Sequence, residues 1–215
     1  MLSDGEMSWP RRATLRLLEQ STRLGSDIDR SPLVGITVNT GLLVLRLVIG
    51  LLLVGHGSQK LFGLFGGPGL AGAGGLFHSL GFRPGKTMAI VAGTSEAGAG
   101  AMLALGLLTP LASAAVIGTL VVAGSVHFAA GLWAQRGGYE LSLVYVTAAA
   151  VLAFTGPGAN SLDNAFGLDG LAGNGWGVAA ILVGVLSGLA VVARGRRALA
   201  GDVAAQAPTA GHALT

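Results

Sequence analysis

Five apolar runs alternate with short polar or glycine-rich connections along the chain. They cover residues 40–62, 86–107, 110–133, 141–155 and 176–193. A helix needs about 17 to 25 predominantly apolar residues to cross a bilayer. The fourth run is short by this measure, but Tyr139 and Phe154 at its flanks can add interfacial length, and Pro157 ends it. The pattern predicts an all-α integral membrane protein: a four-helix transmembrane bundle plus a fifth C-terminal transmembrane helix.

The polar segments outside these runs complete the expected organisation. Within residues 1–36, the stretch 11–24 carries four arginines interleaved with leucines, which favours a basic helix at the membrane surface, while Pro10, Gly25 and Pro32 favour a disordered tail equally well. We expect a four-helix core over residues 37–166 and the fifth helix over residues 167–197. Residues 198–215 are expected to form a disordered C-terminal tail.

Composition supports a membrane location and excludes several chemistries. The chain is 52% hydrophobic and only 11% charged, a mixture that a soluble core of this size does not need. Its basic residues lie next to apolar runs, so they are suited to anchoring at anionic lipid and give no sign of nucleic-acid binding. Cysteine is absent, which excludes disulfides, thiolate metal sites and cysteine catalysis within this chain.

Small residues recur at the spacing used by closely packed membrane helices. They are Ala89, Gly93, Ala97 and Ala101 in the second run and Gly184 with Gly188 in the fifth. Such faces allow backbones to approach closely, within one chain or between copies in a homo-oligomer. The glycine-rich connection 63–85 ends in a short amphipathic piece, LFHSLGF, that can re-enter the membrane interface.

Ionisable residues inside the apolar runs are the most informative feature, because each costs about 2.5 to 3.5 kcal/mol on insertion scales. The candidates are Arg46, His56, Lys60, Glu96, His127 and Glu140. In an up-down bundle, a rise of about 1.5 Å per residue places His56 and His127 roughly 9 Å below one membrane face and Glu96 roughly 15 Å below it. Lys60 and Glu140 lie near that face. All but Arg46 therefore share one half of the membrane.

The spacing of His56, Gln59 and Lys60 puts them on one helix face. Glu96 is their natural counter-ion, and the deeper Arg46 either pairs with Glu96 or extends to the opposite interface. Taken singly, Lys60 and Glu140 fit interfacial anchors and the histidines fit hydrogen bonding to backbone or serine. Together they favour a polar cavity for a small molecule, a quinone or a proton.

Metal and haem chemistry have weaker support. His56 and His127 at equal depth could ligate a b-type haem, but no other feature indicates a haem pocket. A catalytic metal would need a third ligand, for which Glu96 is the nearest option. We therefore predict no metal site, and a quinone as the better cofactor candidate.

Several sequence strings together resemble the DoxX family of bacterial membrane proteins, over about residues 42–166. They are LRLVIGLLLVGHGSQKLFGLFGGPG (45–69), GTSEAGAG (93–100), VHFAAG (126–131), GGYE (137–140) and TGPGANSLD (155–163). The resemblance implies a four-helix, multi-pass protein of the bacterial plasma membrane. Family members are commonly described as oxidoreductase subunits, the family name derives from thiosulfate:quinone-type systems, and some members are linked with oxidative-stress enzymes. The positions carried over are His56, Gln59, Lys60, Glu96, His127, Tyr139, Glu140 and Asp163.

These observations give two functional hypotheses. In the first, the chain is a membrane subunit of an oxidoreductase system, with catalytic roles for His56, Glu96 and His127. Cofactor-binding roles then fall to Gln59, Lys60, Tyr139 and Glu140. With neither cysteine nor a flavin motif, electrons would pass through a partner, such as a soluble redox or oxidative-stress enzyme, so the chain docks quinone or anchors that partner and is not a complete enzyme alone.

In the second hypothesis the chain is a non-catalytic membrane scaffold or a small proton-coupled transporter.

The orientation of the chain in the membrane also has two solutions. The positive-inside rule favours a cytoplasmic location for the face that carries Arg83, Lys86, Arg136 and the C-terminal arginines. A basic N-terminal helix on the cytoplasmic leaflet would reverse this.

Overall fold

The computed structural model describes residues 15–16, 19–21 and 32–206. Most of the predicted N-terminal segment 1–36, and residues 207–215, therefore lie outside the described part. Within that part the chain is helical and contains no strand. The five main helices are α2 (Pro32–Phe62), α4 (Gly85–Leu105), α5 (Thr109–His127), α6 (Glu140–Thr155) and α8 (Asn174–Gln206).

Short helical pieces fill the connections. They are η1 (Leu64–Gly66), α3 (Gly69–Ser79), η2 (Phe128–Ala130), η3 (Ala134–Arg136), α7 (Leu162–Ala165) and η4 (Asp169–Leu171). Four helical stretches of the described chain are long and apolar enough to cross a membrane, namely 34–62, 85–105, 109–130 and 174–205. The predicted all-α fold class is confirmed, and α6, with 16 residues, is a shorter apolar helix. By its helix composition this is a multi-pass membrane protein.

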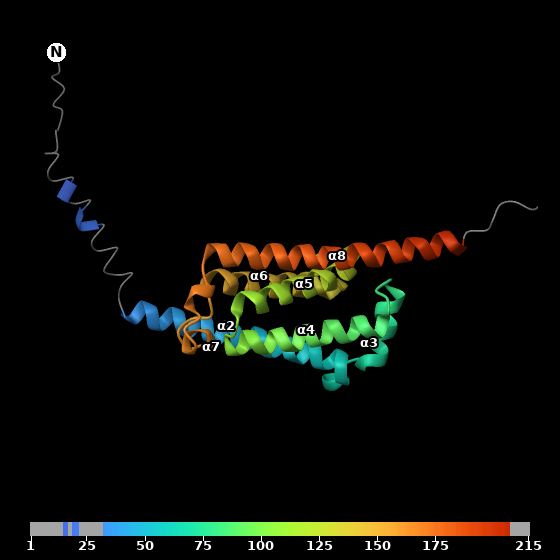
Figure 1. The fold of residues 1–215 in the computed structure, drawn as a ribbon, viewed down its shortest axis with the longest axis horizontal. Coiled ribbons are helices and arrows are strands. Elements are labelled where there is room, and N and C mark those ends of the chain that lie inside the picture. The colour runs from blue at the N-terminus through green and yellow to red at the C-terminus, as the bar shows by residue number, and fades with distance from the viewer. Residues whose placement is uncertain (1–14, 17–18, 22–31, 207–215) are drawn as a thin grey trace, which may run out of the picture.

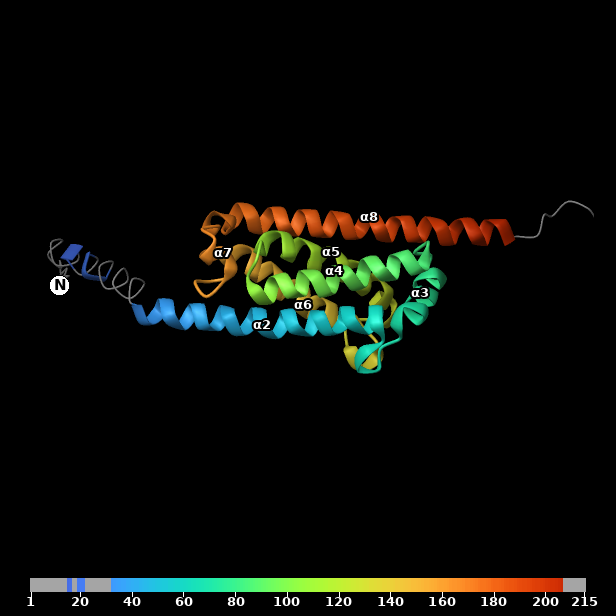
Figure 2. The ribbon, with the colours of Figure 1, turned by 60° about the horizontal axis from the view of Figure 1, so that its bottom comes forward.

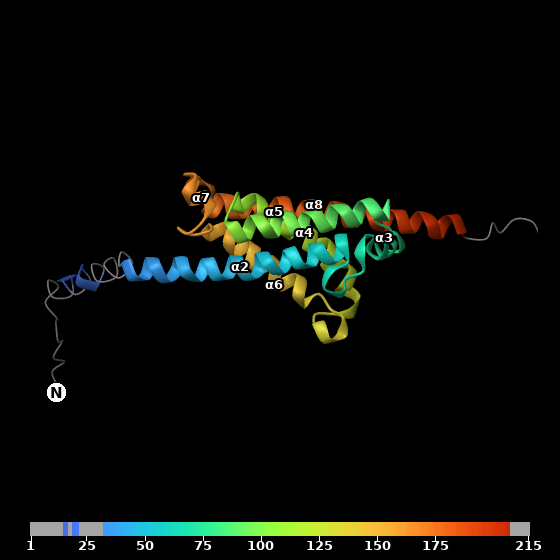
Figure 3. The ribbon, with the colours of Figure 1, turned by 90° about the horizontal axis from the view of Figure 1, so that it is seen from below.

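The main helices run roughly parallel or antiparallel along one long axis (Figure 1). The turn containing α3 lies at one end of the bundle, which we call the α3 end, and α7 lies at the opposite end, the α7 end (Figure 2). The loop between α5 and α6 also lies at the α3 end, where it projects from the bundle (Figure 3). The C-terminus of α2, the N-terminus of α4 and the C-terminus of α5 therefore meet at one end, as the up-down arrangement predicts.

Glycines let two pairs of helices pack at short distance. A Cβ at Gly100 of α4 would lie 2.7 Å from the carbonyl oxygen of Gly50 of α2, and one at Gly188 of α8 would lie 2.7 Å from that of Gly118 of α5. Both distances are too short for a real side chain, so these positions require glycine. The small-residue faces of α4 and α8 thus pack within the chain, and a homo-oligomer stays a prediction.

An apolar core fills the middle of the bundle. Leu53, Leu103, Ile117 and Leu152, from α2, α4, α5 and α6, are each at most 1% exposed. This cluster lies between the polar residues of the two ends. The ends can therefore be considered as separate sites.

Helix boundaries differ from the sequence-based ones in two places that matter. The helix α5 ends at His127, whereas the third run was expected to stay helical to residue 133. The helix α8 continues to Gln206, so residues 198–206 are helical instead of belonging to a disordered tail. The arginines at 194, 196 and 197 interrupt the apolar pattern there but are good helix formers. The other domain boundaries stay predictions.

Candidate ligand site at the α3 end

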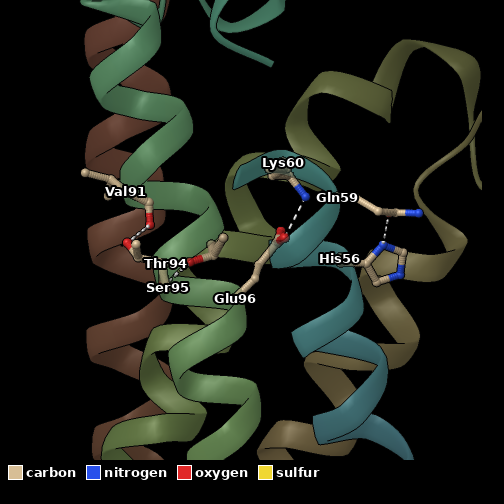
Figure 4. Close-up of polar contacts among 8 residues, drawn as sticks. His56, Gln59, Lys60, Val91, Thr94, Ser95 and Glu96 are labelled. Carbon is tan, nitrogen blue, oxygen red and sulfur yellow. Dashed lines mark hydrogen bonds and ion pairs between the residues drawn. The ribbon is translucent and has the colours of Figure 1, made fainter. Parts of the chain in front are cut away.

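A buried ion pair joins α2 to α4 near the α3 end. The ammonium Nζ of Lys60 donates to Oε2 of Glu96 at 2.6 Å, and the two side chains extend toward each other from their helices (Figure 4). The side chain of Glu96 is only 3% exposed, while that of Lys60 is 26% exposed. The predicted counter-ion relationship is present in the structure, and the carboxylate is the more deeply buried partner.

A histidine and a tyrosine extend this cluster toward α6. Nδ1 of His56 lies 3.3 Å from Oε1 of Gln59, one turn along the same helix. The imidazole of His56 also meets the ring of Tyr145 edge-on, with ring centroids 5.8 Å apart. Tyr145 is 4% exposed. Sequence reasoning missed Tyr145, although a tyrosine in the middle of an otherwise apolar run is the usual sign of a buried hydroxyl.

Two cavities meet at the ion pair. The first, which we call the inner cavity, has a volume of about 340 Å³ and includes His56, His127, Ser142 and Tyr145 in its lining. The second, which we call the lateral cleft, has a volume of about 230 Å³ and lies among α4, α5 and α8. Lys60 and Glu96 line both. The charged pair is thus accessible from two directions in the same half of the bundle.

The remaining predicted site residues organise the loop after α5. Nδ1 of His127 donates to the carbonyl of Gly137 at 2.9 Å, and Oε2 of Glu140 accepts from the backbone N–H of Ala134 at 2.9 Å. The ring of Tyr139 stacks on Phe128 with centroids 5.6 Å apart. His127 is exposed, so its predicted depth is wrong, because α5 ends at this residue.

Hydroxyl groups are a second feature that the sequence reasoning did not single out. Oγ of Ser95 lies 2.7 Å from Oγ1 of Thr119, linking α4 to α5 beside the lateral cleft. Ser187 of α8 lines the same cleft. The position of Ser95 directly before Glu96 was the available signal. Among the residues that the structure describes, no three His, Cys, Asp or Glu side chains are grouped as a metal site would require.

The α7 end holds the other buried charges, in a different arrangement. The carboxylate of Asp163 accepts from the backbone N–H of Leu108 at 2.7 Å and of Thr109 at 3.0 Å, and from the Thr109 hydroxyl at 2.7 Å. It therefore caps the N-terminus of α5, where free N–H groups and the helix dipole favour an anion.

Arg46 is also committed at this end. Its guanidinium donates to the backbone carbonyl of Pro157 at 2.9 Å and to that of Asn160. The expected pair with Glu96 is wrong. The side chain does extend toward the opposite end of the bundle, but it is buried there at 2% exposure and bonds to loop carbonyls instead of reaching the interface. The loop 156–161 folds over the side chain and supplies carbonyl acceptors that no periodicity argument could locate.

Comparison with known families supports the sequence resemblance. Residues 41–133 match the sequence model of the DoxX family. This segment is a DoxX family domain. It contains His56, Gln59, Lys60, Glu96 and His127, whereas Tyr139, Glu140 and Asp163 of the predicted resemblance lie beyond it, as do α6 and α8. Comparison with curated proteins and with solved structures gave no match.

Proposed function

We propose that the inner cavity binds the head group of a membrane quinone and that this DoxX-domain protein is the quinone-docking membrane subunit of an oxidoreductase system. The observation that carries the proposal is the Lys60–Glu96 pair, buried between helices yet lining two cavities. A pair whose role was assembly alone would not need space beside it. Ionisable groups of this kind inside a membrane bundle are typical of functional sites.

The groups around the inner cavity fit the chemistry of a quinone ring. Quinone carbonyls accept hydrogen bonds, and the ammonium of Lys60, the hydroxyl of Tyr145 and the imidazole of His56 are all donors that line this space. Glu96, His127 and Ser142 also line the cavity, and Leu53, Leu120 and Leu141 are available to contact a ring face. A few convergent polar groups in an apolar lining are the usual composition of a small-molecule site.

Reduction of a quinone to a quinol consumes two electrons and two protons. In this proposal the two protons come from water and are passed to the quinone oxygens through Glu96 and His56, which take up and release protons as neighbouring acid–base groups do in other sites, and a soluble reductase supplies the electrons. Arg136 lies in the connection between α5 and α6 at the α3 end, and Lys86 lies in the first turn of α4 there. These cations would attract the acidic surface of such a partner.

The transporter alternative has less support from the packing. The fully buried residues Leu53, Leu103, Ile117 and Leu152 fill the bundle between the two polar ends, and close-packed apolar side chains leave no room for a hydrated path. A scaffold role is compatible with that packing but gives no reason for two cavities at one ion pair. Quinone docking is compatible with the close-packed middle of the bundle and gives a reason for the two cavities at the ion pair.

The test is a binding titration with the full chain in lipid nanodiscs. A benzoquinone with a short alkyl chain should bind the wild-type protein, and Lys60→Met should weaken binding roughly 10- to 100-fold, as loss of a charge-assisted hydrogen bond worth about 1.5–3 kcal/mol implies. Lys86→Met is the matched control, because Lys86 is exposed and does not line either cavity at the ion pair. Equal affinities for all three proteins, or no binding to any, would overturn the proposal.

A further inference from the structure

The lateral cleft lies between two helices that barely touch each other. Both α4 and α8 pack extensively on α5, but not on one another. Met88, Val91 and Ala92 of α4 face Gly188 and Val191 of α8 across the cleft. Gly118 and Val122 of α5 form its floor. The cleft is therefore a groove along the side of the bundle.

Its mouth opens to the surface that faces lipid. Val91 at the rim is 51% exposed, and the neighbouring apolar residues Ile90 and Leu186 are 40% and 63% exposed. In a membrane-spanning bundle, exposed apolar side chains at this level contact acyl chains. A molecule dissolved in the bilayer can thus reach the cleft without crossing water.

The cleft is closed toward the α3 end. Phe77 and Phe82 line it there and pack edge-on, with ring centroids 5.9 Å apart. The buried ring of Phe82 lies against Gly195 of α8, where a Cβ would come within 2.9 Å of it. Next to it, the guanidinium of Arg83 forms a two-pronged ion pair with the Asp202 carboxylate. These contacts tie the α3–α4 connection to α8, so entry is from the side.

The inner end of the cleft is the Lys60–Glu96 pair. At about 230 Å³ the cleft is smaller than the roughly 300 Å³ at which pockets begin to enclose a whole drug-sized ligand. The adjoining inner cavity of about 340 Å³ shares Lys60, Glu96 and Ala123 with it. The inner cavity is lined by polar side chains such as His56 and Tyr145, whereas the cleft is lined mainly by apolar residues. The two spaces therefore suit a polar head group and a hydrocarbon tail of one molecule.

We propose that the lateral cleft holds the hydrocarbon tail of the ligand whose polar head lies at Lys60 and Glu96. This inference rests on the proposed function and specifies its ligand: an amphipathic molecule with a tail on the head group, entering sideways from the membrane. One wall of the cleft comes from α8, outside the DoxX segment 41–133. The additional helix is therefore part of the binding site.

Hydrophobic transfer does not drive tail binding, because the tail leaves lipid that is at least as apolar as the cleft. The tail position, not its affinity, is the direct test. The probe is a benzoquinone whose alkyl tail carries a diazirine, activated by light in nanodiscs containing the full chain, with labelled residues identified by mass spectrometry. The label should fall on α4 and α8 around Val91, Ser187 and Val191, and an excess of unlabelled tailed quinone should remove it.

A narrowing variant gives a second readout. Val91→Trp fills the mouth of the cleft and should slow binding of the tailed probe about tenfold, while a tail-less benzoquinone binds as before. Ile90→Trp is the matched control, because Ile90 is exposed on the same helix but does not line the cleft; it should leave both rates unchanged.

Three outcomes would overturn the tail assignment while leaving the head site intact. These are a label spread over other helices, equal effects of Val91→Trp and Ile90→Trp, and cleft labelling by a photoactivatable phospholipid that tailed quinone does not displace. Failure of the tail-less benzoquinone to bind at all would instead reject the proposed function. The two failures are therefore distinguishable.

Discussion

The buried charges at the two ends of the bundle have different partners. At the α7 end, Asp163 bonds to backbone groups of the turn between α4 and α5, and Arg46 to a backbone carbonyl of the turn between α6 and α7. At the α3 end, Lys60 and Glu96 bond mainly to each other. Both carboxylates are almost completely buried, at 2% exposure for each residue. The difference lies in what surrounds them. Both oxygens of Asp163 accept bonds from a helix N-terminus, while Glu96 faces two cavities.

This contrast distinguishes a buried charge that holds a fold from one available to a ligand. Burial is costly in either case, and the cost has to be offset by bonds. Bonds to backbone groups of a fixed turn stabilise that turn. A pair that opens onto free space can exchange its bonds with an incoming molecule. Four predictions test the contrast, beginning with the largest expected effect.

Removal of the Asp163 carboxylate should be the most damaging change to stability. Asp163→Ala leaves the N–H groups of Leu108 and Thr109 unpaired, and we expect a loss of about 3–5 kcal/mol in unfolding free energy. Thermal unfolding in detergent measures it. Asp169→Ala, at an exposed aspartate of the same region, is the control. Equal stability of the two variants would contradict the capping role.

Arg46→Met should destabilise the protein somewhat less, by about 2–3 kcal/mol, because carbonyls of Pro157 and Asn160 lose a charged donor. Arg46→Lys keeps the charge but not the planar fork, so its unfolding temperature should lie between those of Arg46→Met and the wild type. Quinone affinity of the folded fraction should not change for either variant. A loss of quinone affinity in either variant would contradict the claim that the α7 end plays no part in quinone binding.

The double variant Lys60→Met, Glu96→Gln should show the reverse pattern. Replacing a buried ion pair with neutral side chains of similar size is often neutral or stabilising, so we expect unfolding free energy within about 1 kcal/mol of wild type. Quinone affinity should fall by at least about tenfold. A double variant as unstable as Asp163→Ala would mean that this pair, too, is structural.

His127→Ala should have the smallest effect. Its imidazole is exposed and bonds to the Gly137 carbonyl, so the loss in unfolding free energy should be about 0.5–1.5 kcal/mol. Calorimetric titration should give a quinone affinity closer to wild type than that of His56→Ala. The opposite order would assign the acid–base role to His127 instead of His56.

The sequence predicted the helical elements and the Lys60–Glu96 pair because both follow from local rules. Apolar run length gives the spans. Charge complementarity gives the pair, because Glu96 is the carboxylate available to the helix face that carries Lys60, although helix rise alone placed the two residues at different depths. The prediction for His127 failed because the apolar pattern continues through Phe128–Ala130, while Gly131 at a φ of 81° takes the chain out of the helix. Periodicity does not register a helix end of this kind.

The bonding partners of Arg46 and the role of Asp163 could not be predicted, for a different reason. Their partners are backbone groups of turns distant in sequence, at Pro157, Asn160, Leu108 and Thr109. A pattern of side chains carries no information about which carbonyl or N–H group a loop will present. The cavities depend likewise on how α4 and α8 are spaced by α5, which only the packed structure defines.

Lipid extraction of the purified protein is the most direct test of quinone binding at the α3 end. Protein solubilised from its own membranes and washed free of bulk lipid should release quinone in stoichiometric amount, detected by absorption and mass spectrometry. The Lys60→Met, Glu96→Gln protein should release none above the lipid background, while Arg46→Lys should release as much as the wild type. Equal quinone content in all three proteins, or none in the wild type, would contradict the account.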